Sequence, residues 1–234
     1  MIPPRTYSSP SPPTNSMDNL IPLFPLGIVV FPQQTLPLHI FEERYKMMIS
    51  DCAPECEGGS YSAFGISWEE EGEVAQAGCA VVVSKIVRHH SDGSFDIVTN
   101  ATQRYRAIEV SEDEKPYQPA RVEFFDDLEE GVEPHLEATV RERFRTLVEL
   151  AAREAGAQVP DTLEEGLEDL SGGDAFTMAM RMGLEARYKQ EMLEMESENA
   201  RLESLSGYLE RLLPVLEQRL ERKHSARSNG KAPN

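Results

Sequence analysis

The first half of the chain consists of short apolar segments in which every second side chain faces the same way. Five segments rich in β-branched and aromatic residues have the pattern of strands, at residues 61–67, 78–90, 94–100, 103–110 and 117–125. Asp92 and Gly93 lie between two of these segments, and this dipeptide is a strong signal for a tight hairpin. The pattern predicts a β-rich region that extends to about Phe125.

A proline-rich apolar stretch, IPLFPLGIVVFPQQTLPLHI, precedes these strands. Proline has no N–H to donate to a sheet, so it is confined to strand starts, edges and bulges. We therefore expect three short strands, at residues 20–24, 29–31 and 36–40, that bend at Gly27 and Pro32 between the sheets of a small barrel. Residues 41–52 then predict a helix whose apolar face covers one end of the barrel. The apolar residues of that face are Phe41, Tyr45, Met48 and Ile49.

After residue 126 the apolar spacing changes to every third or fourth position, which indicates helices. Pro134 suits the first turn of one helix, and Gly156 suits its end. One apolar stripe runs along this segment. Its members are Leu136, Val140, Phe144, Leu147 and Val148.

Two further helices are predicted in the C-terminal part. Asp174 has the character of an N-cap for a helix that extends to Met195, and another helix starts near Glu198. Pro214 predicts a bend or a break in this last helix, since an interior proline costs about 3 kcal/mol. A leucine stripe with coiled-coil-like spacing leaves two interpretations open, packing within the chain's own helical bundle or a short coiled coil with a partner. The stripe comprises Leu202, Leu205, Leu209, Leu212 and Leu216.

These patterns predict an α+β fold with four regions along the chain. Residues 1–17 and 224–234 are rich in Pro, Ser, Gly and Asn and are expected to be disordered tails. Residues 18–125 form the β-rich subdomain, and residues 126–223 form the helical subdomain.

Composition and charge narrow the class of protein. The net charge of −18, concentrated in residues 126–174, disfavours binding to nucleic acid or to an anionic membrane surface. Three cysteines do not make a disulfide framework and favour a reducing compartment. No segment has the length and apolar character of a membrane helix or a signal peptide. We expect a cytoplasmic protein.

Motifs for catalysis and cofactor binding do not occur in the sequence. There is no G-x-x-x-x-G-K-[ST] loop to hold phosphates. Ser84 and Lys85 are neighbours in a predicted strand, so their side chains point to opposite faces and cannot pair as nucleophile and base. Cys52 and Cys56 could begin a zinc site, and His89 and His90 flank the hairpin turn, but neither pair has further ligands nearby in sequence. We expect no enzymatic activity, no metal and no cofactor.

Three stretches carry a resemblance to a known family: IPLFPLGIVVFPQQTLPLHIFEERYKMMISDC, AGCAVVVSKIVRHHSDGSFDIVTNATQRYRAIEV and YKQEMLEMESENARLESLSGYLERLL. Together with the Phe-Glu-x-Arg-Tyr box at Phe41 to Tyr45 and the pair Arg104-Tyr105, they resemble the N-terminal substrate-binding domain of Lon proteases, above all the stand-alone bacterial proteins that contain this domain. Ala101 departs from the family, which usually has glycine there.

The resemblance implies a PUA-like pseudobarrel followed by a helical bundle, and a function in recognising other proteins. The ATPase and protease modules of full-length Lon enzymes are not expected, because the chain ends before either could begin. Unfolded or extended polypeptide segments are the implied ligands. An adaptor that serves a separate protease or another complex would use the same peptide-binding chemistry.

Seven residues near the proline-rich stretch are candidates for a peptide-binding groove, which needs apolar pockets and exposed strand edges. Each has a structural alternative, either core packing or an ion pair that locks the helix to the barrel. They are Phe24, Leu26, Val29, Phe31, Glu42, Arg44 and Tyr45. PUA-like barrels also occur as RNA-binding modules, and the alternative nucleic-acid face would consist of Lys85, Arg88, Arg104 and Arg106. Arg104 and Arg106 share one strand face by their spacing.

Overall fold

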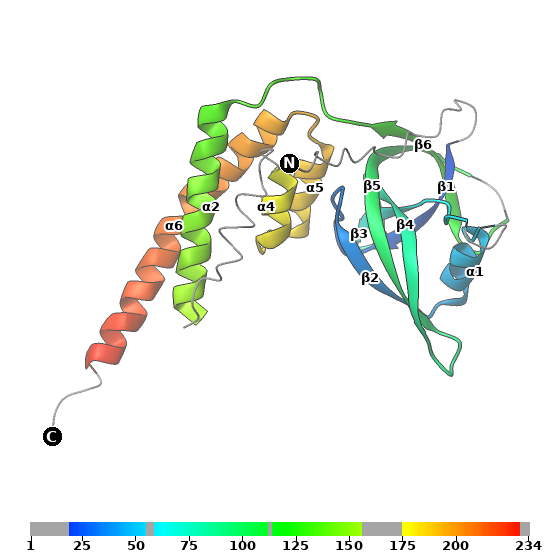
Figure 1. Cartoon of the computed structure of the whole chain (residues 1–234), viewed down its shortest axis with the longest axis horizontal. Coiled ribbons are helices and arrows are strands. Elements are labelled where there is room, and N and C mark those ends of the chain that lie inside the picture. Colours follow the sequence, from blue (N-terminus) through cyan, green and yellow to red (C-terminus); the bar gives the residue numbers. More distant parts are fainter. Residues whose placement is uncertain (1–18, 55–58, 112–113, 156–174, 230–234) are drawn as a thin grey trace, which may run out of the picture.

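The computed structural model describes residues 19–54, 59–111, 114–155 and 175–229. It has a barrel at one end and a group of helices at the other (Figure 1). The strands are β1 (Leu20–Leu26), β2 (Thr35–Ile40), β3 (Phe64–Glu70), β4 (Glu73–His89), β5 (Phe95–Val110) and β6 (Gln118–Phe125). The helices are α1 (Glu43–Asp51), α2 (Pro134–Ala155), α4 (Ala175–Arg181), α5 (Ala186–Glu194) and α6 (Glu198–Asn229). The predicted α+β class is confirmed.

Five of the six strands close into a barrel. Its hydrogen-bonded order is β5, β4, β3, β1 and β6, and β6 returns to pair with β5. Strand β2 joins only the first part of β5, outside this ring. The β4–β5 hairpin turns at Asp92 and Gly93, where Gly93 has a φ of 80°, so the predicted hairpin is confirmed. Two strands were expected at 94–100 and 103–110, but residues 95–110 form the single strand β5.

The proline-rich stretch contains two strands, β1 and β2, with an irregular segment between them. The strands expected at 20–24 and 36–40 are confirmed, β1 extending to Leu26, and the strand expected at 29–31 is wrong. Residues 20–23 of β1 pair with β6, and residues 23–26 pair with β3. Each half of β1 is therefore paired on one side within the described sheet, which is the kind of position where proline is tolerated. Pro37 lies in β2, which pairs on one side only.

The irregular residues after β1 join two separate cores. Val30 packs into the barrel core, whereas Val29 and Phe31 are buried in the core of the helical part. The turn that follows docks on β5, where Gln33 N–H donates to Ala101 O at 3.0 Å and Ala101 N–H donates to Gln34 O at 2.8 Å. Among the described residues other than glycine, Gln33 and Glu71 have positive φ, so Ala101 adopts an ordinary backbone conformation in place of the family's glycine.

Helix α1 covers one end of the barrel, as predicted. Tyr45, Met48 and Ile49 are buried in the barrel core, with the Phe24 and Tyr45 rings 4.0 Å apart. Phe41 was expected on this face, but its position just before α1 leaves it 62% exposed.

A second apolar cluster of the barrel surrounds Tyr105. Its hydroxyl shares a hydrogen bond with Ser67 Oγ at 2.8 Å, and its ring fills the space above two glycines. A Cβ added at Gly65 or Gly78 would lie 2.5 Å from Tyr105 Oη. Glycine is therefore required at both positions by the close approach of the ring.

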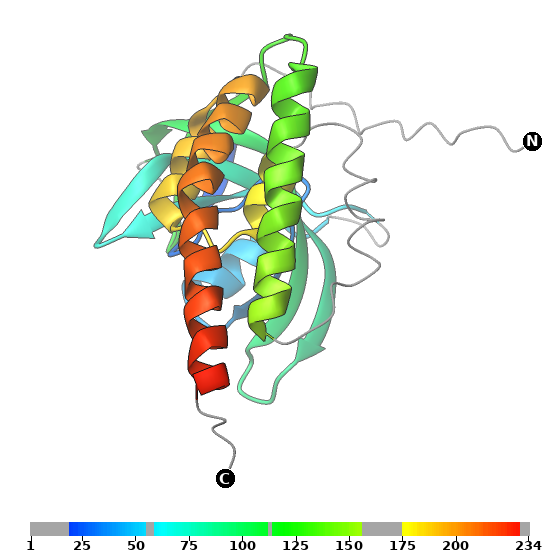
Figure 2. The ribbon, with the colours of Figure 1, turned by 90° about the vertical axis from the view of Figure 1, so that its left-hand side faces the viewer.

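The helical part is built on α2 and α6, which run side by side in the same direction (Figures 1 and 2). Hydrogen bonds join both ends of the pair, from Glu133 N–H to Asn199 Oδ1 at 2.9 Å and from Lys223 Nζ to Glu154 Oε1 at 2.6 Å. The shorter helices α4 and α5 lie between this pair and the barrel. The leucine stripe packs inward at Leu202, Leu205 and Leu209, all buried in the helical core.

Three expectations for the helices are corrected. The helix predicted from Asp174 to Met195 is two helices, interrupted at residues 182–185 around Gly183. Helix α6 is continuous through Pro214, so the break that was one of the two outcomes expected there does not occur. It also extends to Asn229, past residue 224 where a disordered tail was expected. The expected tail over residues 1–17, the predicted N-cap Asp174 and the predicted C-cap Gly156 fall outside the described residues.

Candidate functional site

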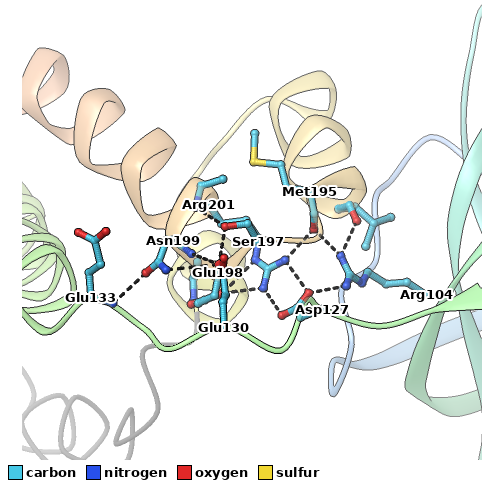
Figure 3. A network of polar contacts seen from close by, with 12 residues as sticks. Arg104, Asp127, Glu130, Glu133, Met195, Ser197, Glu198, Asn199 and Arg201 are labelled. Carbon is cyan, nitrogen blue, oxygen red and sulfur yellow. Dashed lines mark hydrogen bonds and ion pairs between the residues drawn. The ribbon is translucent and has the colours of Figure 1, made fainter.

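Two buried arginines join the barrel to the helical part (Figure 3). Arg201 of α6 donates from Nη1 to Asp127 Oδ1 at 2.8 Å and to Met195 O at 2.7 Å. Its Nε and Nη2 donate to Glu198 Oε2 at 2.9 and 2.7 Å, and Nη2 also donates to Asp127 Oδ2. Every N–H of this guanidinium therefore has a partner, which is what burial of a charged group requires.

Arg104 of β5 reaches the same carboxylate from the barrel side. It donates to Asp127 Oδ1, to Met195 O at 2.6 Å and to Leu193 O at 3.1 Å. Burial lowers the pKa of Arg104, and the Asp127 charge opposes this shift. For Arg201, burial acts in the same direction, but Asp127 and Glu198 outweigh it and raise the pKa. Both arginines remain charged at neutral pH, so two cations face two carboxylates.

A second set of hydrogen bonds holds the connection from β6 to α2 against the start of α6 (Figure 3). Glu130 accepts from Ser197 Oγ at 2.5 Å and from Asn199 Nδ2 at 3.3 Å. Leu128 N–H donates to Glu196 O at 2.8 Å. These contacts and the arginine network fix the helical part against the barrel. Any binding surface on the helices therefore has a defined position relative to the barrel.

An apolar groove with a volume of about 580 Å³ lies on the helical part, away from the arginine network. Among the described residues that line it, Arg181 alone carries a formal charge. Helix α2 contributes Phe144, Leu147, Val148 and Ala151, the end of α4 and the turn after it contribute Arg181, Met182 and Gly183, and α6 contributes Tyr208, Leu212 and Leu216. The volume and apolar lining are typical of a binding pocket. The groove is suited to apolar side chains and has little polar chemistry to offer.

The seven predicted peptide-binding residues do not form one accessible surface. Phe24 and Tyr45 lie in the barrel core, and Val29 and Phe31 lie in the helical core, so these four side chains are held inside the molecule. Leu26 is half-buried against the barrel core. Glu42 and Arg44 are accessible and form an ion pair at 2.8 Å. A direct contact with peptide therefore stays a prediction for Leu26, Glu42 and Arg44.

The four residues of the alternative nucleic-acid face are divided between two places. Lys85 and Arg88 are exposed on β4 near the hairpin. Arg104 is 3% exposed and belongs to the junction described above. Arg106 pairs with Glu196 at 2.8 Å, and both Arg104 and Arg106 lie over the Phe125 ring, which confirms that they share a strand face. The structure does not assemble these residues into one basic face.

The other candidates for chemistry are occupied by packing or hydrogen bonds. Ser84 Oγ donates to Val98 O at 2.9 Å, which uses its hydroxyl in the sheet. Burial raises the pKa of Cys52 to about 11 and that of Cys79 to about 12, so neither thiol is reactive at neutral pH. Cys56 lies outside the described residues. His90 approaches His39 and Asp96, a grouping that the sequence pattern did not predict.

The groove is not among the sites expected from the sequence. Phe144, Leu147 and Val148 were assigned to a core-facing stripe, and Leu212 and Leu216 to the leucine stripe. These five residues, at the C-terminal end of each stripe, line the groove. Apolar residues that continue to the end of both stripes were the signal available in the sequence.

The closed barrel, the capping helix and the helical part joined through buried arginines define a mixed α+β domain. The chain belongs to the family of the ATP-dependent protease La (LON) substrate-binding domain, whose family model matches residues 20–211. A Lon protease of Dictyoglomus thermophilum is 27% identical over 211 residues, which cover 87% of this chain and 26% of that protein. The chain thus spans about a quarter of the length of this relative.

Two solved structures have the same fold. The crystal structure of a Lon N-terminal domain protein from Xanthomonas campestris matches 81% of this chain and 98% of its own, with a TM-score of 0.61 and 21% identity. The N-terminal domain of a Mycobacterium avium complex Lon protease matches 83% of this chain and 100% of its own, with a TM-score of 0.61 and 18% identity. In the part of the chain that the structure describes, no helix has the length and hydropathy needed to span a membrane.

Proposed function

We propose that this chain binds exposed apolar segments of other polypeptides and catalyses no reaction on them. The observation that carries the proposal is the apolar groove on the helical part, in a chain whose family is described as a substrate-binding domain. An unfolded or extended polypeptide exposes apolar side chains that a folded protein buries. The groove can accept such side chains and remove them from water.

The composition of the groove fits this kind of ligand. Its volume of about 580 Å³ accommodates several side chains, and its lining gives van der Waals contact with few directional bonds. Recognition of this kind depends on apolar character and tolerates many sequences. Arg181 at the groove can pair with a peptide carbonyl or carboxylate. Leu26, Glu42 and Arg44 are proposed as a second contact region on the barrel.

The partners that we propose are unfolded or extended segments of cytoplasmic proteins, which the chain holds for a separate protease or another complex. This role needs no nucleotide, metal or nucleophile from the chain itself. It also fits the acidic net charge, which disfavours RNA as the ligand.

Equilibrium binding to a defined unfolded polypeptide tests the proposal. The probe is a reduced and carboxymethylated protein with a fluorescent label, titrated with the chain at two salt concentrations. Ala151 is exposed and lines the groove, so Ala151→Glu places a carboxylate there with little effect on folding. We expect this variant to weaken binding by at least about tenfold, the equivalent of 1.4 kcal/mol.

The matched control is Ala138→Glu, the same substitution at an exposed position of α2 that does not line the groove. It should bind as the unmodified chain does. Arg44→Glu tests the second contact region in the same assay. Equal affinities for Ala151→Glu and Ala138→Glu would contradict the assignment of the groove. A steep loss of affinity with added salt would point to an electrostatic ligand instead.

Residues 156–174 connect α2 to α4, and both of these helices contribute residues to the lining of the groove. Replacing this segment by a glycine-serine linker shows whether the chain itself competes with the polypeptide. Tighter binding after the replacement would place that competition at the groove, and the Ala151→Glu effect should persist in the same background.

A further inference from the structure

Three side chains with metal-ligating atoms meet where β2 and the β4–β5 hairpin lie together. His39 is on β2 directly opposite Asp96 on β5, and His90 follows the last residue of β4. Their ligand atoms all lie within 4.8 Å of one another. This is the one group of three such residues found among the described parts of the chain.

The Asp96 carboxylate stands between the two imidazoles. His39 Nδ1 lies 2.6 Å from Asp96 Oδ1, and His90 Nε2 lies 2.9 Å from Asp96 Oδ2. Each imidazole thus directs one nitrogen at the carboxylate. A metal cation bound by these nitrogen and oxygen atoms would replace the protons of the two hydrogen bonds. The His39 and His90 ring centroids are 5.4 Å apart.

The backbone holds the three residues in place independently of any ion. His39 and Asp96 are cross-strand neighbours, so the pairing of β2 with β5 fixes their separation. His90 is fixed by hydrogen bonds across the hairpin, from His90 N–H to Ser94 O at 2.8 Å and from Gly93 N–H to His90 O at 3.1 Å. The turn is fixed in addition by Ser94 N–H and Oγ, which donate to Asp92 Oδ1 at 3.0 and 2.7 Å. A preorganised set of this kind reduces the ordering entropy that binding has to overcome.

We propose that His39, His90 and Asp96 bind one Zn²⁺ ion, with solvent in the fourth coordination position. Two imidazole nitrogens and one carboxylate oxygen suit a cation of intermediate softness, whereas Mg²⁺ and Ca²⁺ prefer all-oxygen sites. The His39 side chain is 51% exposed, so the fourth position opens to solvent. The Phe41 ring stacks near the His39 ring at 5.9 Å and shields one side of it.

Zinc fits the geometry with small side-chain movements. Tetrahedral zinc with bonds of 2.0–2.2 Å separates its ligand atoms by about 3.4 Å. The two hydrogen-bonded contacts of 2.6 and 2.9 Å need to open by less than 1 Å, and the widest separation is no more than 4.8 Å. The bound ion fastens the outer strand β2 to the hairpin, because its ligands come from β2, β5 and the residue after β4.

The test is a zinc titration of the untagged chain against a chromophoric chelator. Cys56→Ser is the background, because a free thiolate is itself a zinc ligand. We expect one zinc per chain and a rise in the thermal unfolding midpoint with added zinc. His90→Gln and Asp96→Asn should each weaken binding by at least about tenfold, since even outer-shell changes at metal sites cost 10–100-fold.

The matched control is His89→Gln, on the same hairpin, whose ring instead contacts Phe95 with centroids 5.7 Å apart. It should bind zinc as its background does. Imidazole ¹⁵N spectra of the Cys56→Ser chain, which is otherwise unaltered, give a readout that does not depend on how the histidine and aspartate variants fold. Zinc should shift the signals of His39 and His90 and leave those of His89 and His135 in place. The absence of binding, equal affinity in His90→Gln and His89→Gln, or shifts confined to other histidines would overturn the proposal.

Discussion

Replacing Arg201 tests whether the arginine network holds the helical part to the barrel. Its side chain is 1% exposed, makes five hydrogen bonds and lies over the Phe176 ring at 4.2 Å. Arg201→Met keeps most of the volume but removes the charge and every donor. Asp127 and the Met195 carbonyl still have Arg104, whereas the Glu198 carboxylate, 13% exposed, loses the Arg201 guanidinium.

The size of the effect follows from the two buried ion pairs that the substitution removes. Removing one partner of a buried ion pair costs about 3–5 kcal/mol. Because Asp127 is 40% exposed and keeps a partner, we expect the lower end, about 3 kcal/mol. For a domain of this size, that corresponds to a fall of roughly 6–12 °C in the unfolding midpoint. Urea unfolding followed by circular dichroism and by fluorescence measures it, since the single tryptophan, Trp68, packs against the helical core.

Two variants make the comparison specific. Arg187→Met removes an exposed ion pair with Glu70, 3.3 Å long with Arg187 74% exposed, and should cost no more than about 1 kcal/mol. Arg201→Met combined with Glu198→Gln should be more stable than Arg201→Met alone, because glutamine keeps an acceptor for Ala175 N–H without a buried charge. Unfolding of Arg201→Met and Arg187→Met at the same urea concentration, or a double variant less stable than Arg201→Met, would contradict the stabilising role of the arginine network.

Three further outcomes follow from the barrel. Gly78→Ala should destabilise by roughly 1–3 kcal/mol in urea unfolding, because its Cβ would lie 2.4 Å from a backbone oxygen, whereas Gly131→Ala, with open space around it, should not. Cys79, whose pKa burial raises to about 12, should resist iodoacetamide at pH 8 in the native protein and react in urea; labelling of the native thiol would contradict its burial. The hydrogen bond from Lys115 holds the pKa of the Asp51 carboxyl below its usual 3.8. The stability that this pairing gives the folded chain is therefore present above pH 3.8, and it is lost as the pH falls through the pKa of Asp51 in the folded state. The stability difference between the unmodified chain and Asp51→Asn should therefore shrink in acid, and a constant difference would count against this pairing.

Local signals were sufficient for most elements of the fold. Alternation identified the strands, the Asp92-Gly93 dipeptide identified the hairpin, and the apolar face of α1 identified Tyr45 as part of the barrel cap. These features depend on residues close together in the chain, where periodicity and turn chemistry act directly.

The sequence-based predictions were wrong, or missed a contact, where segments far apart in the chain determine the environment of a side chain. Phe31 has the pattern of a strand residue, but the helical core supplies its environment, and its ring stacks on Phe176 at a centroid distance of 4.8 Å. In the sequence Arg104 has the pattern of a surface cation, but the fold buries it beside Asp127 and Arg201, which come from other parts of the chain. His39 and Asp96 are 57 positions apart, and only the register of β2 against β5 brings them together. No spacing rule within one segment contains this information.

Site-specific photo-crosslinking tests directly whether an unfolded polypeptide binds in the apolar groove. A photoreactive phenylalanine analogue is placed at position 151 in the groove or at position 138 on the other side of α2, and each chain is irradiated with the same reduced, carboxymethylated polypeptide. Recognition through the groove predicts a crosslinked product from position 151 that unlabelled unfolded polypeptide competes away, and little product from position 138. Equal yields from the two positions, or no product from position 151, would contradict it.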